Sequence, residues 1–373
     1  MPQKPKFKKY TSRQLWFYFR RALWILISWV LVSNVFFFYE FFTLESEGII
    51  SSSYDFYSEF TANLVVATLA GLVGGIFTVN LMDNWLRRHA FWKALTYITL
   101  AYVGAALIIS TIGASYYYTD QLGHSITHPD VLYEVRGFFG TFIFLKNFIL
   151  WLLIVIVTLI VLMVNDKYGP GVFPDYLLGR YFRPKNERRI FMFADIKSAT
   201  HIAEELGEQK YFNFLKDFFR DIAPAIVQTR GEVYQYVGDE VVLSWKMKPG
   251  LKRGNAIQCF YSMKQILKYK ESRYLKKYGF KPEFKAGYHM GNVMVGEIGQ
   301  IKRDIVFTGD VLNTTARIQA MCNELDVEVL ASETFADIAY QLPRGVTKHP
   351  MGSKQLKGKA EEIALFTYTK KGG

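Results

Sequence analysis

Four long apolar runs before residue 166 limit how this chain can fold. Each holds about 20 residues or more, the length that an α-helix needs to cross the hydrocarbon core of a bilayer. They cover residues 22–42, 60–82, 91–115 and 138–164. A helix satisfies its own backbone hydrogen bonds in lipid, so the runs predict a transmembrane domain of four helices over residues 22–165.

Positive charge is placed around these runs in a chain whose formal net charge is +12. Residues 1–21 contain Lys and Arg but no acid, and the connections at residues 83–93 and 165–189 are also basic. The connections at residues 43–59 and 116–134 contain no Lys or Arg. Basic connections stay on the cytoplasmic side, so we expect a basic cytoplasmic N-terminus, residues 1–21, and a cytoplasmic C-terminal half at the cell inner (plasma) membrane.

The same placement of charge indicates which partners to expect. Basic residues next to apolar runs predict contact with a lipid membrane. They argue against nucleic acid, whose binding needs basic residues interleaved with aromatic residues on one face. Residues 166–187 form a basic juxtamembrane linker with an amphipathic stretch at 174–182. This linker either lies along anionic lipid or transmits a change in helix packing.

Two features inside the apolar runs concern the helices themselves. The small residues of "GLVGG", residues 71–75, allow two helices to approach closely, within one protomer or between two. Lys146 lies in the fourth run, where its ammonium group either snorkels to the interface or has a function in the membrane. The four helices can act as an anchor, as a dimerising element or as a receptor for an unidentified ligand.

Residues 188–370 are predicted to form one α+β domain with a mostly antiparallel sheet. Cys259 and Cys322 lie in this half without metal-ligand spacing, so we expect free cytoplasmic thiols. Apolar periodicity and turn residues predict the following elements. They are a buried strand ending at Ala194, helices at 200–207 and 209–229, a hairpin at 231–245, a helix at 253–278, a strand at 283–290 ended by Gly291, a strand at 304–308, a helix from Asp310, and short strands near 327–330 and 363–369.

The stretch "IFMFADIKSAT", residues 190–200, places a carboxylate at the end of a buried strand. Burying an unpaired charge is costly, so Asp195 needs a partner. One interpretation is an N-cap, since residues 197–200 lead into a helical pattern. The other is a functional carboxylate that holds a cation.

A second carboxylate, Asp239, follows Gly238 between two predicted strands. Gly-Asp is common in an ordinary hairpin turn. If the strands that carry Asp195 and Asp239 are neighbours, however, the two side chains meet at one edge of the sheet. Like charges there are costly unless a cation joins them. Carboxylates without His or Cys suit Mg²⁺, and two such ions favour in-line phosphoryl displacement.

Further residues fit a phosphorylated substrate. A turn precedes the helix that follows Asp195, and helix N-terminal amides bind phosphate. This turn consists of Ile196, Lys197, Ser198, Ala199 and Thr200. In "LKGK", Lys357 and Lys359 flank Gly358 within reach of a triphosphate, although a solvated basic turn has the same composition.

The segment "NTTAR" places Asn313 and Arg317 four residues apart, so both lie on one face of a helix. Arg suits the transition state of phosphoryl transfer, and Asn can orient a sugar hydroxyl. The alternative is an ordinary polar pair on the surface.

Five segments in order resemble the catalytic domain of class III nucleotidyl cyclases, the adenylate and guanylate cyclases. They are "FMFADIKSAT", "GEVYQYVGDEVVLSW", "KAGYHMGNVMVGEIG", "IVFTGDVLNTTARIQ" and "LKGKAEEIALFTY", spread over about residues 186–370. No single segment is specific, whereas the five in this order are. The preceding "LLGRYFRPKNERR" resembles the connector of bacterial membrane-anchored members.

The resemblance implies a ferredoxin-like βαββαβ core that forms a head-to-tail homodimer with active sites at the interface. Asp195, Asp239 and the Ile196 carbonyl would hold two Mg²⁺ or Mn²⁺ ions from one protomer. Asn313 and Arg317 would come from the other protomer, and a Lys of "LKGK" would contact the β- and γ-phosphates of ATP. The ribose 3′-hydroxyl would attack the α-phosphorus, which gives 3′,5′-cyclic AMP and pyrophosphate for signal transduction.

Departures from the family pattern concern the base. Adenylate cyclases usually carry Lys at the position of Gln235, and Asp, Thr or Ser at the position of Val306. Guanylate cyclases would have Glu and Cys there. The Gln235 amide offers a donor and an acceptor, so it can pair with adenine or with another base, and Thr308 is a nearby helper. We expect ATP, with GTP or a pyrimidine nucleotide as alternatives.

Two other functions share parts of this pattern. A diguanylate cyclase has the same core fold but needs a Gly-Gly-Asp/Glu-Glu-Phe hairpin, and the turn here is "YVGDEVV". A catalytically silent membrane receptor would use a cyclase-like domain to bind nucleotide or to dimerise. The presence of Asp195, Asp239, Asn313 and Arg317 favours an active cyclase, which is a phosphorus–oxygen lyase.

Overall fold

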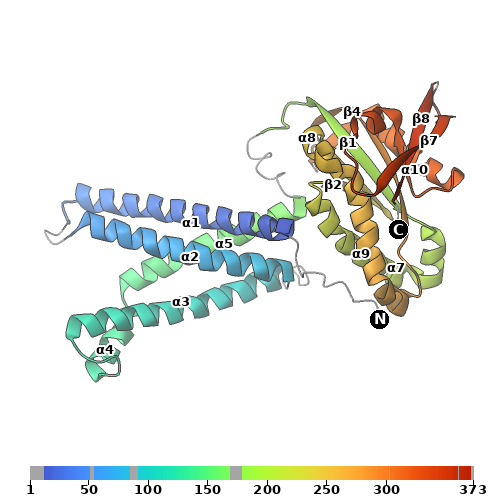
Figure 1. The fold of residues 1–373 in the computed structure, drawn as a ribbon. Helices are drawn as coiled ribbons and strands as arrows, with labels where there is room; N and C mark the ends of the chain where they lie inside the picture. Colours follow the sequence, from blue (N-terminus) through green and yellow to red (C-terminus); the bar gives the residue numbers. More distant parts are fainter. Residues whose placement is uncertain are drawn as a thin grey trace. The chain divides into compact units, whose positions relative to one another are not determined.

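The computed structural model of the protein describes residues 12–50, 54–84, 91–168, 179–301, 303–359 and 361–370 (Figure 1). Contacts divide the chain into two compact units, Met1–Lys167 and Tyr168–Gly373. The first unit is helical, and the second combines helices with one sheet. An amphipathic stretch was predicted in the linker at residues 174–182, and its residues 174–178 lie outside the described residues.

The first unit contains the four predicted long helices. They are α1 (Ser12–Ser46), α2 (Phe56–Asn84), α3 (Phe91–Leu122) and α5 (Phe142–Tyr168). Each includes a segment that is long and apolar enough to cross a membrane. The segments are Tyr18–Ser46, Phe56–Val79, Leu95–Leu122 and Phe142–Val164. The prediction of four apolar spans is therefore confirmed.

The fourth span begins at Phe142 and not at residue 138 as predicted. A short helix that the apolar pattern did not reveal, α4 (Pro129–Phe138), ends at Phe138, the first residue of that run. Thr141 then caps α5, because its hydroxyl accepts a hydrogen bond from the Phe144 amide at 3.2 Å. The cap starts a new helix although the residues around it are apolar.

Helices α1 and α2 lie side by side (Figure 1), and glycines of α2 explain their close approach. A Cβ added at Gly71 would lie 3.0 Å from the Cα of Leu26, and one at Gly74 would lie 2.6 Å from the Trp29 ring. The small residues predicted to allow close packing therefore serve a contact within one protomer. The Trp29 indole donates a hydrogen bond to the Thr158 hydroxyl of α5 at 2.8 Å.

Lys146, in the fourth span, has a partner inside the helical unit. Its ammonium group forms an ion pair with Glu40 of α1, and both side chains are half-exposed. The pair joins α5 to α1, so helix packing accounts for a charge within an apolar run.

The second unit is built on one sheet with the strand order β2-β3-β1-β4-β6-β8-β7, in which β5 also pairs with β4. All strand pairs are antiparallel except β4 with β6. The strands are β1 (Lys185–Ile196), β2 (Glu232–Val237), β3 (Glu240–Lys246), β4 (Phe284–Ile298), β5 (Asp304–Thr308), β6 (Val329–Ser332), β7 (Val346–Gln355) and β8 (Glu362–Lys370).

Two long helices connect the first four strands. Helix α7 (Ala199–Gln228) follows β1, and α9 (Asn255–Tyr278) follows β3. The order β2-β3-β1-β4 with these crossovers is the ferredoxin-like βαββαβ arrangement that the sequence predicts. The break predicted between residues 207 and 209 is a kink in α7 at Gly207, which has φ of 69°.

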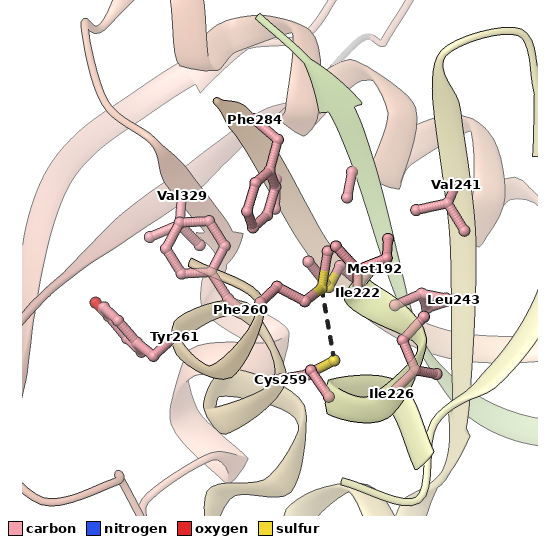
Figure 2. Close-up of a cluster of buried hydrophobic side chains, with 14 of the residues drawn as sticks. Met192, Ile222, Ile226, Val241, Leu243, Cys259, Phe260, Tyr261, Phe284 and Val329 are labelled. Carbon is pink, nitrogen blue, oxygen red and sulfur yellow. Dashed lines mark hydrogen bonds between the residues drawn. The ribbon is translucent and has the colours of Figure 1, made fainter. Parts of the chain in front are cut away.

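Strand β1 is buried on both faces, because alternate residues enter different cores. One core lies under α7 and α9, and Figure 2 shows part of it. Its residues from β1 are Ile190, Met192, Ala194 and Ile196. On the opposite face, Phe191 and Phe193 pack with Val311 of α10 (Asp310–Glu324). Asp195 has the parity of Phe193, so its carboxylate faces the α10 side of the sheet.

The end of β1 differs from the prediction. The strand continues to Ile196 instead of ending at Ala194, because Asp195 stays paired with its two neighbours, β3 and β4. Ser198 and not Asp195 occupies the N-cap position of α7. The N-cap interpretation of Asp195 is therefore wrong, and its carboxylate must be explained by other partners.

Strand β4 also runs further than predicted, through Gly291 to Ile298. Gly291 does not end the strand. A Cβ there would lie 2.5 Å from a methyl group of Val311, and a Cβ at Gly287 would lie 2.4 Å from the backbone nitrogen of Gln319. Both glycines therefore let α10 pack directly on β4.

The remaining elements are short or exposed. Strand β7 was not predicted, because most of its side chains are exposed and it lacks an apolar alternation. The short helices are α8 (Met247–Leu251), the 3₁₀ turn η2 (Lys252–Gly254) and α11 (Glu333–Ile338). Cys259 and Cys322 are free and buried, as predicted.

The glycine contacts under α10 can be tested by adding a methyl group. Gly291→Ala should destabilise the domain by about 1–3 kcal/mol through overpacking, and Val311→Ala should recover part of that loss in the double variant. Gly287→Ala should not be recovered by Val311→Ala, since it meets the α10 backbone. Hydrogen exchange of β4 and α10 peptides in the solubilised chain measures the effect. Equal stability of Gly287→Ala and the unmodified protein would contradict the close packing.

Candidate active site

The two predicted carboxylates meet at one end of the central strands. Asp195 lies in β1, and Asp239 lies in the turn between β2 and β3. Gly238 gives this turn its left-handed backbone, with φ of 61°. Glu240 opens β3 and lies directly opposite Asp195 in the sheet. Pairing of β1 with β3 thus gathers three acidic side chains.

The surroundings of Asp239 and Glu240 raise the pKa of both carboxyl groups. Burial, followed by a hydrogen bond and repulsion from Asp195, raises the pKa of Asp239 to about 6. Burial and then the charges of Asp195 and Asp239 raise the pKa of Glu240 to about 7. The effect extends to Tyr211 of α7, whose pKa is raised to about 12 by burial and then by the same two aspartates. Negative charge is crowded at this position.

Two polar side chains that the sequence did not single out hold Asp195. The Lys285 ammonium group lies 3.3 Å from its Oδ2 atom, and the Gln319 amide donates to the same oxygen at 3.2 Å. Lys285 is buried in β4, and Gln319 is buried in α10. A lysine two residues before Gly287, inside a predicted strand, was the signal available in the sequence.

The carboxylates of Asp195 and Asp239 fit a divalent metal ion. Mg²⁺ and Mn²⁺ take carboxylate and carbonyl oxygens, and the Ile196 carbonyl directly follows Asp195 in the chain. A cation would also relieve the repulsion that raises the pKa of Asp239. Crowded carboxylates with raised pKa values are therefore a reason to expect a metal at this end of β1.

The predicted phosphate-binding turn lies immediately after the carboxylates. Ser198 and Thr200 are exposed, and Ser198 makes no side-chain capping bond at the start of α7. The Lys197 amide is already used, since it donates to the Glu283 carbonyl at 2.9 Å. Ala199, the first residue of α7, begins the run of helical amides that a phosphate can meet.

Arg317 and the "LKGK" turn lie together. A Cβ added at Gly358 would be 3.4 Å from Nη2 of Arg317, so the guanidinium group lies against the turn. Asn313, one helical turn earlier on α10, is exposed. The structure thus groups Asn313 and Arg317 with the lysine turn.

The two lysines of this turn differ in their surroundings. Lys359 forms an ion pair with Asp310 at the start of α10, and this pair lowers the pKa of Asp310. Asp310 also accepts a hydrogen bond from Thr314 at 3.2 Å. Lys357 is exposed. A phosphate can reach Lys357 without breaking the pair of Lys359.

The three base-reading candidates come from two strands. Gln235 is exposed on β2, and Val306 and Thr308 lie on β5. Their neighbours Tyr234 and Phe307 contact each other on the face of the sheet that α10 covers. The Phe307 amide donates to the Tyr234 hydroxyl at 3.3 Å, and their ring centroids are 4.9 Å apart. Strands β2 and β5 are held together next to the candidate positions.

Comparison with known proteins finds relatives of the second unit. Residues 184–369 match the model of the adenylate and guanylate cyclase catalytic domain family. "Adenylate cyclase 2" of Rhizobium meliloti (strain 1021) is 32% identical over 211 residues, which cover 56% of this chain and 57% of that protein. "Adenylate cyclase 1" of the same organism is 25% identical over 180 residues, which cover 47% of this chain and 26% of that protein.

A solved structure is also similar to this unit. The adenylyl cyclase CyaB from P. aeruginosa is 18% identical, with a TM-score of 0.44, and the match covers 50% of this chain and 96% of that one. The chain spans only about a quarter to just over half of the length of the two Rhizobium meliloti relatives. Through its residues 184–369, the protein belongs to the class III adenylate and guanylate cyclase family.

Proposed function

We propose that the protein is a membrane-anchored adenylate cyclase that converts ATP to 3′,5′-cyclic AMP and pyrophosphate in signal transduction. The observation that carries this proposal is the crowding of Asp195, Asp239 and Glu240 beside the start of α7. Carboxylates with raised pKa values next to free helical amides suit a metal-bound polyphosphate. The similarity to proteins called adenylate cyclases supports ATP as the substrate.

Asp195, Asp239 and the Ile196 carbonyl would hold two Mg²⁺ or Mn²⁺ ions in each site. When bound, such ions supply positive charge at the α-phosphate and lower the pKa of the attacking 3′-hydroxyl. Lys285 and Gln319 keep the Asp195 carboxylate in place from two sides. The 3′-oxygen bonds to the α-phosphorus, its proton is lost, and the bond to pyrophosphate breaks.

Arg317 and Asn313 would act on the nucleotide itself. The Arg317 guanidinium would stabilise the charge that develops on the phosphoryl oxygens, and the Asn313 amide would orient the ribose. Lys357 would bind the β- and γ-phosphates, because Lys359 is paired with Asp310. The exposed start of α7, from Lys197 to Thr200, would meet the phosphate groups on the other side.

A homodimer would complete each site. The edge strand β2 exposes Val233, Tyr236 and Val237, and β4 exposes Met294 and Ile298. Exposed apolar side chains need a cover, both on the edge strand β2 and on the inner strand β4, and a second copy of this chain would provide one. Metal-binding carboxylates from one protomer would then face Asn313 and Arg317 of the other.

The choice of base rests on Gln235. An exposed amide on β2 can donate to and accept from adenine. Val306 has no polar atom in its side chain, and Thr308, two residues later in β5, offers a hydroxyl group. The same amide can flip and pair with another base, which makes GTP or a pyrimidine nucleotide the alternative substrate.

The four spans would anchor the cyclase in the inner (plasma) membrane with both termini in the cytoplasm. Four crossings return the chain to the side on which it started. The basic residues at positions 1–21, 83–93 and 165–189 then all lie on that side.

Removing either aspartate should abolish turnover and leave the fold intact. Asp195→Asn and Asp239→Asn should each lower kcat by about 10³-fold or more, since a lost metal contact is worth several kcal/mol. Asp337→Asn, at an exposed carboxylate of α11, is the control and should keep full activity. Cyclic nucleotide release by the solubilised protein is the measurement, and full activity of Asp195→Asn would refute the metal assignment.

Mixing two inactive protomers should restore activity if each site is shared. Co-expressed Asp195→Asn and Arg317→Ala chains should give about a quarter of the unmodified activity, because half of the dimers are mixed and each has one intact site. Co-expressed Asp195→Asn and Asp239→Asn chains should stay inactive, since both changes damage the same half of a site. Mixed dimers that form but show no activity would exclude the shared site.

The substrate can be identified from the product. Each of the four nucleoside triphosphates is incubated separately with the solubilised protein and Mg²⁺ or Mn²⁺, and cyclic products are identified by mass. We expect cyclic AMP as the main product. Gln235→Ala should lower kcat/KM for ATP, while the thermal stability stays close to that of the unmodified protein. A different cyclic nucleotide would show that ATP is not the substrate and would leave the proposed reaction type unchanged. No product from any triphosphate would favour the silent receptor.

A further inference from the structure

The segment between the third and fourth spans brings two histidines and an aspartate together. His124 follows α3, and His128 and Asp130 lie at the start of α4. One ligand atom from each lies within 4.8 Å of the other two. The two imidazole rings stack with centroids 4.0 Å apart, and Nδ1 of His128 lies 3.5 Å from Oδ2 of Asp130.

The turn that carries these residues is held by the backbone and by a small core. Gly123, with φ of 65°, allows the chain to leave α3, and the His128 amide donates to the Ser125 carbonyl at 2.9 Å. Helix α4 then folds back against the end of α3. The buried residues between them are Ala114, Val131 and Val135. Because both ends of the turn are fixed, His124 and His128 stay close without a ligand.

We propose that His124, His128 and Asp130 form a binding site for a divalent transition-metal ion of the Zn²⁺ class. Two imidazoles and one carboxylate are protein ligands that Zn²⁺ takes, with water in its fourth position. Tetrahedral ligand atoms lie about 3.4 Å apart, so the partly exposed side chains must close in by about an ångström. Imidazole ligands distinguish this site from the carboxylates at Asp195 and Asp239, which suit Mg²⁺.

The local charge favours a cation. Residues 116–134 contain Asp120, Asp130 and Glu134 and no Lys or Arg. Helix capping explains only part of the arrangement. It accounts for His128, whose Nδ1 atom accepts a hydrogen bond from the Asp130 amide at 3.4 Å. A neutral imidazole has one free lone pair, so a metal ion would take Nδ1 of His128 in place of this contact, and Nε2 would keep its proton. Capping does not explain why the His124 ring stacks on the His128 ring.

The place of the site in the chain gives it a possible use. It lies between spans three and four, so four crossings put it on the opposite side of the membrane from the proposed cytoplasmic cyclase. A bound ion would fasten the end of α3 to α4, which leads into α5 and then along the chain to β1. Such an ion is a candidate for the unidentified ligand of the transmembrane part. The binding itself does not depend on the proposed cyclase activity.

Metal content of the solubilised full chain, prepared without a histidine tag, tests the site. The protein is dialysed against micromolar Zn²⁺ with excess Mg²⁺ to occupy the carboxylates, and bound Zn²⁺ is measured by elemental analysis. We expect about one Zn²⁺ per chain, lost in the double variant His124→Gln/His128→Gln. His349→Gln is the matched control, since His349 lies in β7 and hydrogen-bonds to Thr347 and Thr369.

A conservative replacement separates loss of ligands from loss of fold. His124→Cys should keep the ion, and Co²⁺ bound in place of Zn²⁺ should gain the near-ultraviolet absorption of a thiolate ligand. Asp130→Asn should weaken binding without abolishing it. Unchanged Zn²⁺ content in the double histidine variant, or no bound Zn²⁺ in the unmodified protein, would overturn the proposal.

Discussion

Repulsion among Asp195, Asp239 and Glu240 is the interaction on which the catalytic unit depends. The central strand β1 is covered on both faces, so the carboxylate at its end cannot turn fully into water. Lys285 and Gln319 hold Asp195 in this position. Burial, and then the neighbouring Asp195, raises the pKa of Asp239 and of Glu240. A structure built only for stability would not gather three acids at one strand end.

Packing of α10 on the sheet connects the two groups of functional residues. Gly287 and Gly291 leave no side chain between β4 and the helix, so the helix lies against the strand backbone. Because α10 lies this close to β4, the Gln319 side chain reaches Asp195, and Arg317 lies beside Gly358 of the lysine turn. The glycines of β4 therefore fix how close α10 lies to the sheet, and with it the positions of Gln319 and Arg317.

The parts of the fold that follow from local pattern could be predicted from the sequence. Apolar length defined the four spans, and strand alternation with a Gly238 turn defined the β2–β3 hairpin. The end of β1 and the course of β4 could not be predicted in this way. Asp195 remains in its strand because of pairing with β3 and β4, and Gly291 is explained by Val311, a residue 20 positions later in the sequence.

Long-range contacts also explain which residues of the site the sequence missed. Asp195, Asp239, Asn313 and Arg317 stand in recognisable segments, so their types suggested a chemistry before any contact was known. Lys285 and Gln319 stand at the ends of two such segments, but nothing local marks their role, and only β1–β4 pairing and α10 packing place them on Asp195. Helix α4 was missed because nearly all of it lies before the fourth apolar run, in a stretch interpreted as a connection.

The two candidate metal sites differ in a way that suits separate roles. Carboxylates and a carbonyl at Asp195 and Asp239 select hard ions that are always abundant with nucleotides, so their occupancy carries no signal. Imidazoles at His124 and His128 select a scarcer, softer ion, whose occupancy varies with its supply. An ion that joins α3 to α4 changes the freedom of α5, and α5 leads along the chain to the strand that ends in Asp195. Along the chain α5 is followed by the linker and then by β1, so a change at α5 would reach the catalytic unit through β1.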